Sequence, residues 1–393
     1  MAGTFKTHDK NGNEMVRCEV CGRYYHQLSV HLAKKHKMSV EEYKRQYPGC
    51  PTISAWASQQ VSEAQKKAQR GQHTQTETHA NVVPNITANI NDWEGTELDF
   101  GAAKLTVKRT AEMSDRDRGF IPEHDPNYHV DGELAEMLAL GVEQGDNVMM
   151  VGPTGCGKTT LAEELAALIN QPARRANLHG DVRSSDFVGE KVVEVDPETS
   201  QSVITWKDGI LPEAMRNGYW LLLDEVDAAP PQILFVLQAV LDSGKLILTS
   251  NHGEVVEPHP DFRIITTANT TGRGDDTGLY AGTNVLNEAF LDRFGTVIQH
   301  NYLPPKVEAG VVSKKTGVEI AAAQRCVEVA RLVRNGFDNE ECYCTLSTRR
   351  LISWAKKIKA LGAQKAAKVA VLNKLNREDA DYVAGVIQRI FGN

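Results

Sequence analysis

A short glycine-rich segment carries the pattern most suited to binding phosphate groups. GPTGCGKT, residues 152–159, fits the spacing G-x-x-x-x-G-K-[ST] in full. Its glycines let backbone N–H groups turn toward a β-phosphate, and the start of a helix adds a positive dipole end. Lys158 is expected to bridge the β- and γ-phosphates of a nucleotide, and the Thr159 hydroxyl to ligate Mg²⁺. The alternative is a glycine-rich turn with a chance lysine.

The context of this segment favours the phosphate-binding interpretation. It follows the apolar run NVMMVG and precedes TTLAEELAALI, which has the composition of a helix. The residues expected to contact ATP are Gly152, Pro153, Thr154, Gly155, Cys156, Gly157, Lys158, Thr159 and Thr160. Cys156 fills a tolerant position in the loop, although a thiol there could make the site sensitive to oxidation.

Two adjacent carboxylates end the apolar run WLLLDEVD. Buried carboxylates are costly unless they serve a cation or a water molecule. Asp224 is expected to hold the Mg²⁺ shell, and Glu225 to polarise the attacking water. The alternative is a purely structural pair at the end of a strand. Asp227 lies close in sequence, without a defined role.

Three further polar positions could complete such a site. Asn269 ends the apolar run FRIITTAN, where it either orients a water molecule or caps the chain end. Arg293 lies in NEAFLDRFG, and arginine is suited to stabilising phosphate charge, often across a subunit boundary. An arginine beside an aspartate is also a common surface pair. LSTRRLISWA offers Arg349 and Arg350 at the start of a helix.

A separate group of metal-ligating residue types lies near the N-terminus, at the spacing C-x₂-C-x₉-H-x₄-H. The four candidate ligands are Cys18, Cys21, His31 and His36. Two thiolates and two imidazoles at this spacing suit tetrahedral Zn²⁺. The histidines would share a short helix, with Leu28 and Leu32 as its small core. His26 is a less well placed rival ligand, and the alternative is four scattered residues without a metal.

The elements that must position these residues alternate between strand and helix. Strands are expected at 147–152, 219–225 and 262–269, with a shorter strand-like patch at 105–110. This alternation predicts an α/β fold with a parallel sheet. After residue 305 the chain is expected to be helical to its end. With 393 residues, two or three folded units are expected.

Charge is unevenly distributed along the chain. The net charge of −7 divides into +6 for residues 1–70 and −13 for the remainder, which suggests two modules with different partners. Seven cysteines without disulfide-like spacing are expected to be metal ligands or buried thiols. No run approaches the roughly 20 apolar residues of a membrane span. The N-terminal segment MAGTFKTHDKNGNEM lacks the apolar core of a signal peptide. We therefore expect a cytoplasmic protein without membrane contact.

Taken together, residues 120–305 resemble the AAA+ ATPases of the MoxR and chelatase branch, most closely the CobS subunits of cobaltochelatase. The similar strings include GFIPEHDPNYHVD, WKDGILPEAMRNG, LLLDEVDAAPPQILFVLQAVLDSGKL and GDDTGLYAGTNVLNEAFLDRF. In this resemblance Asn269 is sensor 1, Arg293 the arginine finger and Arg349 sensor 2, since Ser-x-Arg aligns with residues 347–349.

The resemblance implies a P-loop core with flanking helices and a helical lid. It also implies hairpins at 186–209 and 246–260, and a ring, usually a hexamer, with ATP at the subunit boundaries. A partner with a von Willebrand factor A domain is common in this family. Residues 18–49 resemble the MucR/Ros-type zinc finger, which CobS subunits do not need. The expected domains are 1–58 (zinc finger), 59–115 (polar helix and flexible linker), 116–305 (ATPase core) and 306–393 (lid).

Several functions are consistent with these features. The first is a ring-forming ATPase that remodels a partner and is recruited through the finger. The others are an ATP-dependent subunit of a cobaltochelatase-type metal chelatase, and a DNA-binding regulator that uses the ATPase as a nucleotide switch. The presence of Glu225, Asn269, Arg293 and Arg349 favours ATP hydrolysis over nucleotide binding alone. The basic residues of the finger suit either DNA or protein docking; they are Lys34, Lys35, Lys37, Lys44 and Arg45.

Overall fold

The computed structural model divides the chain into two units, residues 1–79 and residues 80–393. It describes residues 15–25, 28, 31–48, 50–52, 54, 93–196, 200–270, 272, 283–339 and 341–392. The polar helix and most of the linker expected within 59–115 lie outside these residues. Within the described segments, every helix is too short or too polar to cross a membrane.

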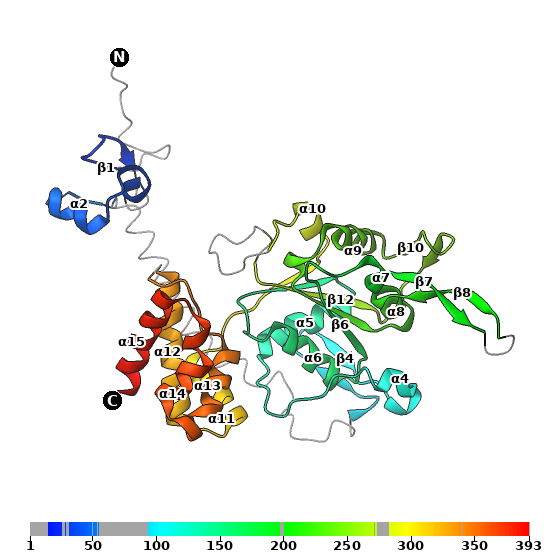
Figure 1. Cartoon of the computed structure of the whole chain (residues 1–393). Helices are drawn as coiled ribbons and strands as arrows, with labels where there is room; N and C mark the ends of the chain where they lie inside the picture. The colour runs from blue at the N-terminus through cyan, green and yellow to red at the C-terminus, as the bar shows by residue number, and fades with distance from the viewer. Residues whose placement is uncertain are drawn as a thin grey trace, which may run out of the picture. The chain divides into compact units, whose positions relative to one another are not determined.

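Five parallel strands form the central sheet of the larger unit, in the order β13-β5-β12-β9-β6 (Figure 1). Their bounds are β5 Val148–Val151, β6 Ala173–Asn177, β9 Trp220–Asp224, β12 Arg263–Ala268 and β13 Thr296–Gln299. The three interior strands are almost entirely buried, as apolar strands with both faces covered must be. The three longer predicted strands are therefore confirmed, and their carboxyl ends share one edge.

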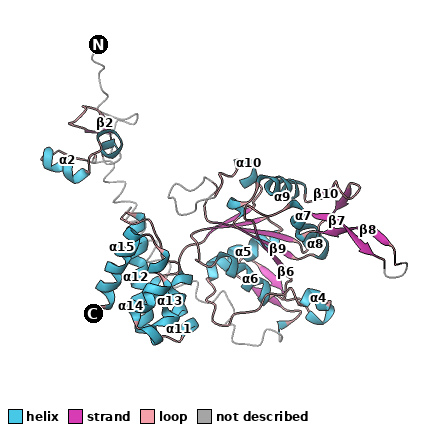
Figure 2. Ribbon diagram, in the orientation of Figure 1, coloured by secondary structure: helices cyan, strands magenta, loops and turns pink. Residues whose placement is uncertain are grey.

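Helices cover both faces of this sheet, as Figure 2 shows. Alternate residues of each strand enter opposite cores: Met149 and Val151 join one apolar cluster, whereas Val148 and Met150 join the other. The helices α8 and α9 pack in the first cluster, and α5 and α6 in the second. Their bounds are α5 Gly132–Gln144, α6 Lys158–Leu168, α8 Ile210–Asn217 and α9 Pro231–Ser243.

Three antiparallel hairpins accompany the sheet. They pair β3 Glu97–Asp99 with β4 Lys104–Thr106, β7 Gly189–Val195 with β8 Ser202–Asp208, and β10 Leu246–Leu248 with β11 Glu254–Val256. The last two confirm the two predicted hairpins. The strand expected at 105–110 is shorter than predicted, because Lys108 already donates its N–H to the Ile169 carbonyl outside the hairpin.

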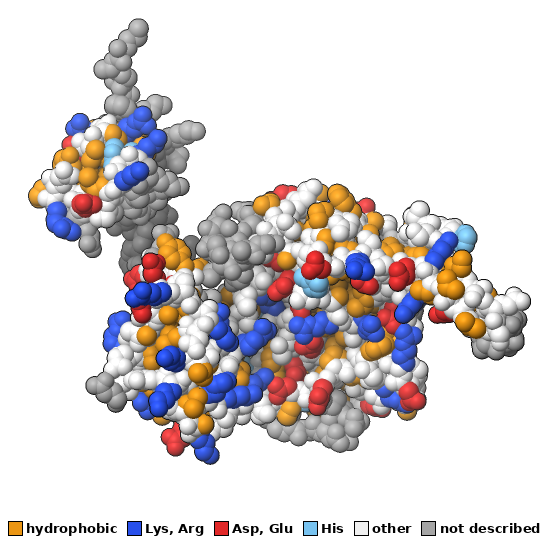
Figure 3. All heavy atoms as spheres, viewed as in Figure 1, with side chains coloured by type: hydrophobic (Ala, Val, Ile, Leu, Met, Phe, Trp, Pro, Cys, Tyr) orange, Lys and Arg blue, Asp and Glu red, His pale blue; other side chains and the backbone are white. Residues whose placement is uncertain are grey.

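The long β7–β8 hairpin carries apolar side chains on its surface. Val193 pairs with Ile204, and their exposed fractions are 70% and 72% (Figure 3). The short helices of this unit connect the larger elements. They are η3 Thr110–Glu112, α4 Asp115–Arg118, α7 Ser184–Phe187, η4 Val226–Ala228 and α10 Glu288–Leu291.

A helical subdomain follows the sheet and begins with Pro305, a favourable first helical residue. Its elements are α11 Pro305–Thr316, α12 Ile320–Asp338, α13 Thr348–Leu361, α14 Ala363–Ala370, η5 Leu372–Lys374 and α15 Arg377–Phe391. They pack around their own core, in which Trp354 is fully buried. The described part of residues 305–392 holds no strand, as predicted.

In the smaller unit, the described residues form two short strands and two helices. They are β1 Val16–Arg17, β2 Tyr24–Tyr25, the π-helix η1 Leu32–His36 and α2 Val40–Gln46. Leu28 and Leu32 are fully buried, as expected, together with Tyr43. The Tyr43 hydroxyl accepts a hydrogen bond from the Glu19 backbone N–H at 2.8 Å. The predicted helix that carries the two histidines is present in η1 and in His31 just before it.

Candidate functional site

The backbone of the phosphate loop requires glycine at three positions. Gly155 and Gly157 have φ angles of 71° and 112°, which L side chains rarely adopt. A Cβ atom on Gly152 would lie 1.9 Å from the His300 carbonyl oxygen. The loop leaves β5 and opens α6, with Gly157 as the N-cap. Helix start and loop N–H groups therefore occupy the position that phosphate binding needs.

Lys158 folds back onto the loop. Its Nζ donates to the carbonyl oxygens of Gly152 (2.7 Å) and Pro153 (3.1 Å) and to the Asn269 Oδ1 (3.2 Å). Burial lowers the pKa of Lys158, whereas nearby carboxylates favour its charged form. A phosphate group would offer this ammonium a charged acceptor in place of neutral carbonyls, and charge-assisted hydrogen bonds are the stronger ones.

Asp224 and Thr159 are joined directly. The Thr159 hydroxyl donates to Asp224 Oδ1 at 2.6 Å, and the Thr267 hydroxyl donates to the same oxygen at 2.9 Å. Asp224 is buried at the end of β9. A hydroxyl and a carboxylate are hard oxygen donors, which Mg²⁺ prefers. The donor set therefore fits Mg²⁺, with Thr159 and Asp224 as the residues that would hold it.

Glu225 departs from the strand geometry of its neighbours. Its φ of 58° lies in the left-handed region, which is uncommon for a residue other than glycine and is typical of functional sites. Its backbone N–H donates to the Thr267 hydroxyl at 3.3 Å. The turn leaves the Glu225 side chain exposed, immediately beside the buried Asp224. One carboxylate is thus fixed for a cation while its neighbour is accessible to water.

Asp227 has a structural task that the sequence had left undefined. Its Oδ2 accepts hydrogen bonds from the N–H groups of Asn269 and Thr270 and from the Thr270 hydroxyl, each at 3.0 Å. Asp227 is fully buried, and its Oδ1 has no hydrogen-bond partner within the described part of the chain. This carboxylate therefore fixes the strand end at which Asn269 stands.

These side chains surround one cavity of about 210 Å³. Its lining includes Thr154, Gly155, Gly157, Lys158, Thr159, Thr160, Asp224, Glu225, Asn269 and Arg349. Arg349 comes from the helical lid, whereas Arg350 instead donates to the Thr345 carbonyl oxygen. Three lining residues were not predicted from the sequence: Arg175 and Asn177 of β6, and Thr267 of β12. Of these, Thr267 alone lies in a run that the sequence marks as a strand.

A second, adjoining cavity of about 220 Å³ shares the phosphate loop. Tyr128 and His129 line it on one side, Cys156 and Gly157 on another, and Ile352 of α13 contributes from the lid. Aromatic and apolar walls of this kind suit the base of a nucleotide. Tyr128 and His129 belong to the segment GFIPEHDPNYHVD, and no role was predicted for them from the sequence. Burial raises the pKa of the Cys156 thiol, which keeps this thiol protonated and little reactive.

Arg293 is the one proposed catalytic residue that lies apart from both cavity linings. Its guanidinium lies 3.3 Å from Asp242 Oδ1 and donates to the Ala289 carbonyl oxygen. Its Nε is buried and has no hydrogen-bond partner among the residues that the structure describes. The position of Arg293 between α10 and β13 gives it no contact with the nucleotide cavity of its own chain.

The four candidate metal ligands of the smaller unit converge. Their ligand atoms all lie within 4.8 Å of one another; the residues are Cys18, Cys21, His31 and His36. Cys21 Sγ lies 3.2 Å from His31 Nε2, which lies 3.1 Å from His36 Nε2. Burial and the nearby His36 lower the pKa of His31, which favours the neutral imidazole that binds metals. Two thiols and two imidazoles fit tetrahedral Zn²⁺. His26 lies outside the described residues.

Comparison with known proteins supports the architecture of the larger unit. Residues 147–294 match the family described as AAA domain (dynein-related subfamily), and residues 308–391 match the one described as CbbQ/NirQ/NorQ C-terminal. The aerobic cobaltochelatase subunit CobS of Sinorhizobium sp is 35% identical over 316 residues, which are 79% of this chain and 92% of the relative.

The chain is also similar to proteins other than CobS. Protein CbbQ of Hydrogenophilus thermoluteolus is 30% identical over 237 residues, which are 59% of this chain and 82% of the relative. Among solved structures, a RuvB mutant of Thermotoga maritima is 15% identical with a TM-score of 0.40, over 69% of this chain and 74% of that one. The phosphate loop, the acidic pair and the matched families define a nucleotide hydrolase. The chain belongs to the AAA+ ATPases of the CobS and CbbQ type.

Proposed function

We propose that this chain is a ring-forming ATPase that uses ATP hydrolysis to remodel a partner protein or complex. The observation that carries the proposal is the convergence of Glu225, Asn269 and Arg349 on the cavity of the phosphate loop. A protein that only binds nucleotide as a switch has little need of a carboxylate beside the Mg²⁺ ligands. A chain that turns ATP over requires a group that activates water at that position.

The residues have separate tasks in this reaction. The loop N–H groups and Lys158 hold the β- and γ-phosphates. Thr159 and Asp224 would hold Mg²⁺, which would supply positive charge against the phosphates. Glu225 accepts the proton of the attacking water, because its carboxylate is exposed to the cavity. Asn269 orients that water, and Arg349 binds the γ-phosphate from the lid.

The second cavity takes the adenine base in this proposal. Tyr128 and His129 contribute aromatic rings, and Ile352 an apolar contact from the lid. Lys315 of α11 forms an ion pair with Asp125 at 2.6 Å, which ties the lid to the segment that carries these rings. Binding of the base would therefore be sensitive to the position of the lid.

The position of Arg293 supports assembly into a ring. Because this guanidinium contacts no group of its own nucleotide cavity, we assign it to the ATP of a neighbouring subunit, as the arginine finger of the ring. We expect a hexamer. Arg293→Ala should then retain ATP binding and lose hydrolysis, and a mixture with Lys158→Ala should recover activity, since some interfaces pair an intact Arg293 with an intact Lys158.

Sedimentation of the wild-type chain with ATP measures the same assembly directly. A monomer with full activity, or a mixture no more active than its two components, would overturn the ring. Remodelling itself is tested by adding candidate partners. Stimulation of ATP hydrolysis by a protein with a von Willebrand factor A domain is the outcome that the proposal expects.

A metal-chelatase role is the second candidate, favoured by the extent of the similarity to CobS, which covers 92% of that relative. In that case a large chelatase subunit would stimulate ATP hydrolysis, and hydrolysis would accompany insertion of cobalt into a macrocycle. Stimulation by a von Willebrand factor A-domain protein alone would favour general remodelling instead.

Recruitment is the role we propose for the smaller unit, with Zn²⁺ bound by Cys18, Cys21, His31 and His36. Its described surface includes several exposed cations; they are Arg17, Arg23, Lys35, Lys37, Lys44 and Arg45. Such a surface suits the phosphates of DNA, and several weak contacts in a ring add up through avidity. Steeply salt-dependent DNA binding that Cys18→Ser removes would support this contact, whereas DNA binding unchanged by Cys18→Ser would favour protein docking.

A further inference from the structure

Arg175 connects the acidic strand end with the helix that follows the phosphate loop. Its Nε donates to Asp224 Oδ2 at 2.6 Å, and its Nη1 donates to Glu163 Oε1 at 3.0 Å. Arg175 belongs to β6, the edge strand beside β9, whereas Glu163 belongs to α6. One guanidinium thus joins three elements that together form the nucleotide cavity.

The two oxygens of Asp224 have different partners: two hydroxyls on one and a guanidinium on the other. Oδ1 accepts the hydroxyls of Thr159 and Thr267, and Oδ2 accepts Arg175. The Asp224 side chain is only 7% exposed, so these partners, rather than water, satisfy its oxygens. Among its three partners, Arg175 alone brings a positive charge. Arg175 also fixes the orientation of the Asp224 carboxylate, because the guanidinium group is planar and rigid.

We propose that Arg175 is a positioning residue for the Mg²⁺ site, which holds Asp224 Oδ2 and thereby directs its Oδ1 toward Thr159. This inference rests on the proposed assignment of Thr159 and Asp224 as the residues that hold Mg²⁺. A cation beside Asp224 also repels Mg²⁺. The orientation effect outweighs this repulsion because Arg175 is half exposed and well screened, whereas Asp224 is buried.

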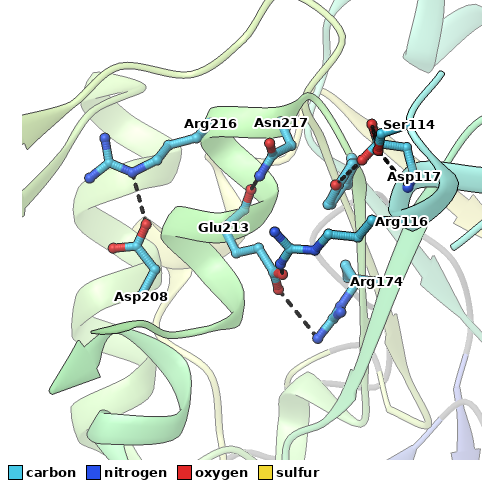
Figure 4. A network of polar contacts seen from close by, with 9 residues as sticks. Ser114, Arg116, Asp117, Arg174, Asp208, Glu213, Arg216 and Asn217 are labelled. Carbon is cyan, nitrogen blue, oxygen red and sulfur yellow. Dashed lines mark hydrogen bonds and ion pairs between the residues drawn. The ribbon is translucent and has the colours of Figure 1, made fainter. Parts of the chain in front are cut away.

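The neighbouring residue supplies a matched control. Arg174 lies on the same strand but faces the opposite side, where its guanidinium lies 3.3 Å from Glu213 and 4.4 Å from the centre of the Phe120 ring. Figure 4 shows this contact within a polar network that includes Arg116 and Asp117. Arg174→Gln therefore removes the same charge from the same strand without touching Asp224.

The test measures nucleotide binding rather than hydrolysis. A fluorescent ADP analogue is titrated onto the full chain in EDTA and at increasing Mg²⁺ concentrations. For Arg175→Gln, the Mg²⁺ concentration at half-maximal effect should rise about tenfold or more, as loss of an outer partner of a metal ligand commonly causes. The ADP affinity of this variant should fall more in the presence of Mg²⁺ than in EDTA. Arg175→Lys, which keeps the charge but not the fork, should show a smaller rise, and Arg174→Gln none.

Three results would overturn the inference. The first is an unchanged Mg²⁺ dependence in both Arg175 variants, and the second is an equal loss of ADP affinity with and without Mg²⁺, which indicates a merely structural role. In the third, the wild-type chain shows no Mg²⁺ effect; this would remove the Mg²⁺ site itself and the role of Arg175 with it. If Arg175→Gln does not fold, Arg175→Lys decides between the first two.

Discussion

The nucleotide cavity and the four-residue metal cluster are built in opposite ways. The cavity lies at the edge of a five-stranded sheet whose two faces are covered by separate apolar cores. Its polar side chains already bond to one another, as Thr159 does to Asp224. Among the described residues, the core around the cluster consists of Val16, Cys18, Leu28, Leu32 and Tyr43, and it includes the candidate ligand Cys18 itself. The four candidate ligands therefore make up a large part of the side chains that pack at the centre of the described residues of this unit.

This difference indicates which site depends on its ligand. A sheet with two cores supplies ample burial for stability, so the phosphate loop keeps its shape through packing and glycine geometry alone. A unit of about 40 residues cannot bury enough apolar surface by itself, and metal binding then provides much of its folding free energy. We infer that the nucleotide cavity keeps its structure without a ligand, whereas the smaller unit needs a bound metal ion in order to fold.

Removal of Zn²⁺ should have the largest effect, and on one unit only. The free energy of structural Zn²⁺ binding is about 10–16 kcal/mol, more than a unit of this size gains from its core. Chelation with phenanthroline, or Cys18→Ser, should therefore unfold residues 15–54. The ATPase rate of the same chain should remain within about twofold.

Limited proteolysis of the full chain, followed by mass spectrometry, measures both halves of this prediction. Cys50→Ser is the matched control, because Cys50 packs on the same small core but is not one of the four converging ligands. A finger that stays protected after chelation, or less than one Zn²⁺ per wild-type chain, would contradict the comparison.

The next largest effect is expected for Lys158→Ala. The ammonium is the positive side chain closest to the loop carbonyls, and its loss removes charge-assisted hydrogen bonds to two phosphates. ATP affinity should fall by about 100-fold or more, while the thermal midpoint of the sheet changes little. Isothermal titration measures the affinity. Wild-type affinity in the variant would mean that the loop does not bind the phosphates as we assign them.

Asp227→Ala should reduce turnover by about tenfold with little change in ATP affinity. The substitution releases the N–H groups of Asn269 and Thr270, so the group that orients water loses its fixed position. Steady-state kinetics should show a lower kcat at nearly constant KM. An equal loss in kcat and in ATP affinity would instead indicate general damage to the strand end.

The smallest effect concerns pH. Burial lowers the pKa of His300, which lies beside the phosphate loop, and the charge of Lys158 adds to this shift, whereas Asp131 and a hydrogen bond to the Asn301 carbonyl oppose it. Below the ordinary histidine pKa of about 6.5, the unfolded chain binds a proton that the folded chain does not. The free energy of unfolding should therefore be highest above a pH of about 6.5 and should decrease as the pH falls below it.

Thermal unfolding between pH 7.5 and 5.5 measures this decline, which should amount to a few degrees. His300→Gln should flatten it in part, and the remaining slope belongs to other groups such as His129, whose pKa burial also lowers. A steeper decline in the variant than in the wild type would contradict the assignment.

Much of this architecture follows from local sequence signals. Apolar runs ending in DE or in Asn mark the carboxyl ends of buried strands, and the glycine spacing marks the loop, so β5, β9 and β12 and their site residues are predictable. Arg175, Asp227 and Tyr128 are not, because their roles depend on which strand lies beside β9 and on which segment covers the loop. Sheet order is a non-local property. The role that we propose for Arg293 depends on a neighbouring subunit, which the sequence of one chain does not position.

We propose that Glu225 activates water in a cavity where Lys158, Thr159 and Asp224 hold the nucleotide. Single-turnover hydrolysis of radiolabelled ATP by full-length Glu225→Gln tests it most directly, because the glutamine keeps the size of the side chain but not its basicity. We expect the variant to bind ATP with Mg²⁺ as tightly as wild type and to cleave it about 10²–10⁴-fold more slowly. Cleavage at the wild-type rate would contradict the assignment of Glu225 as the base.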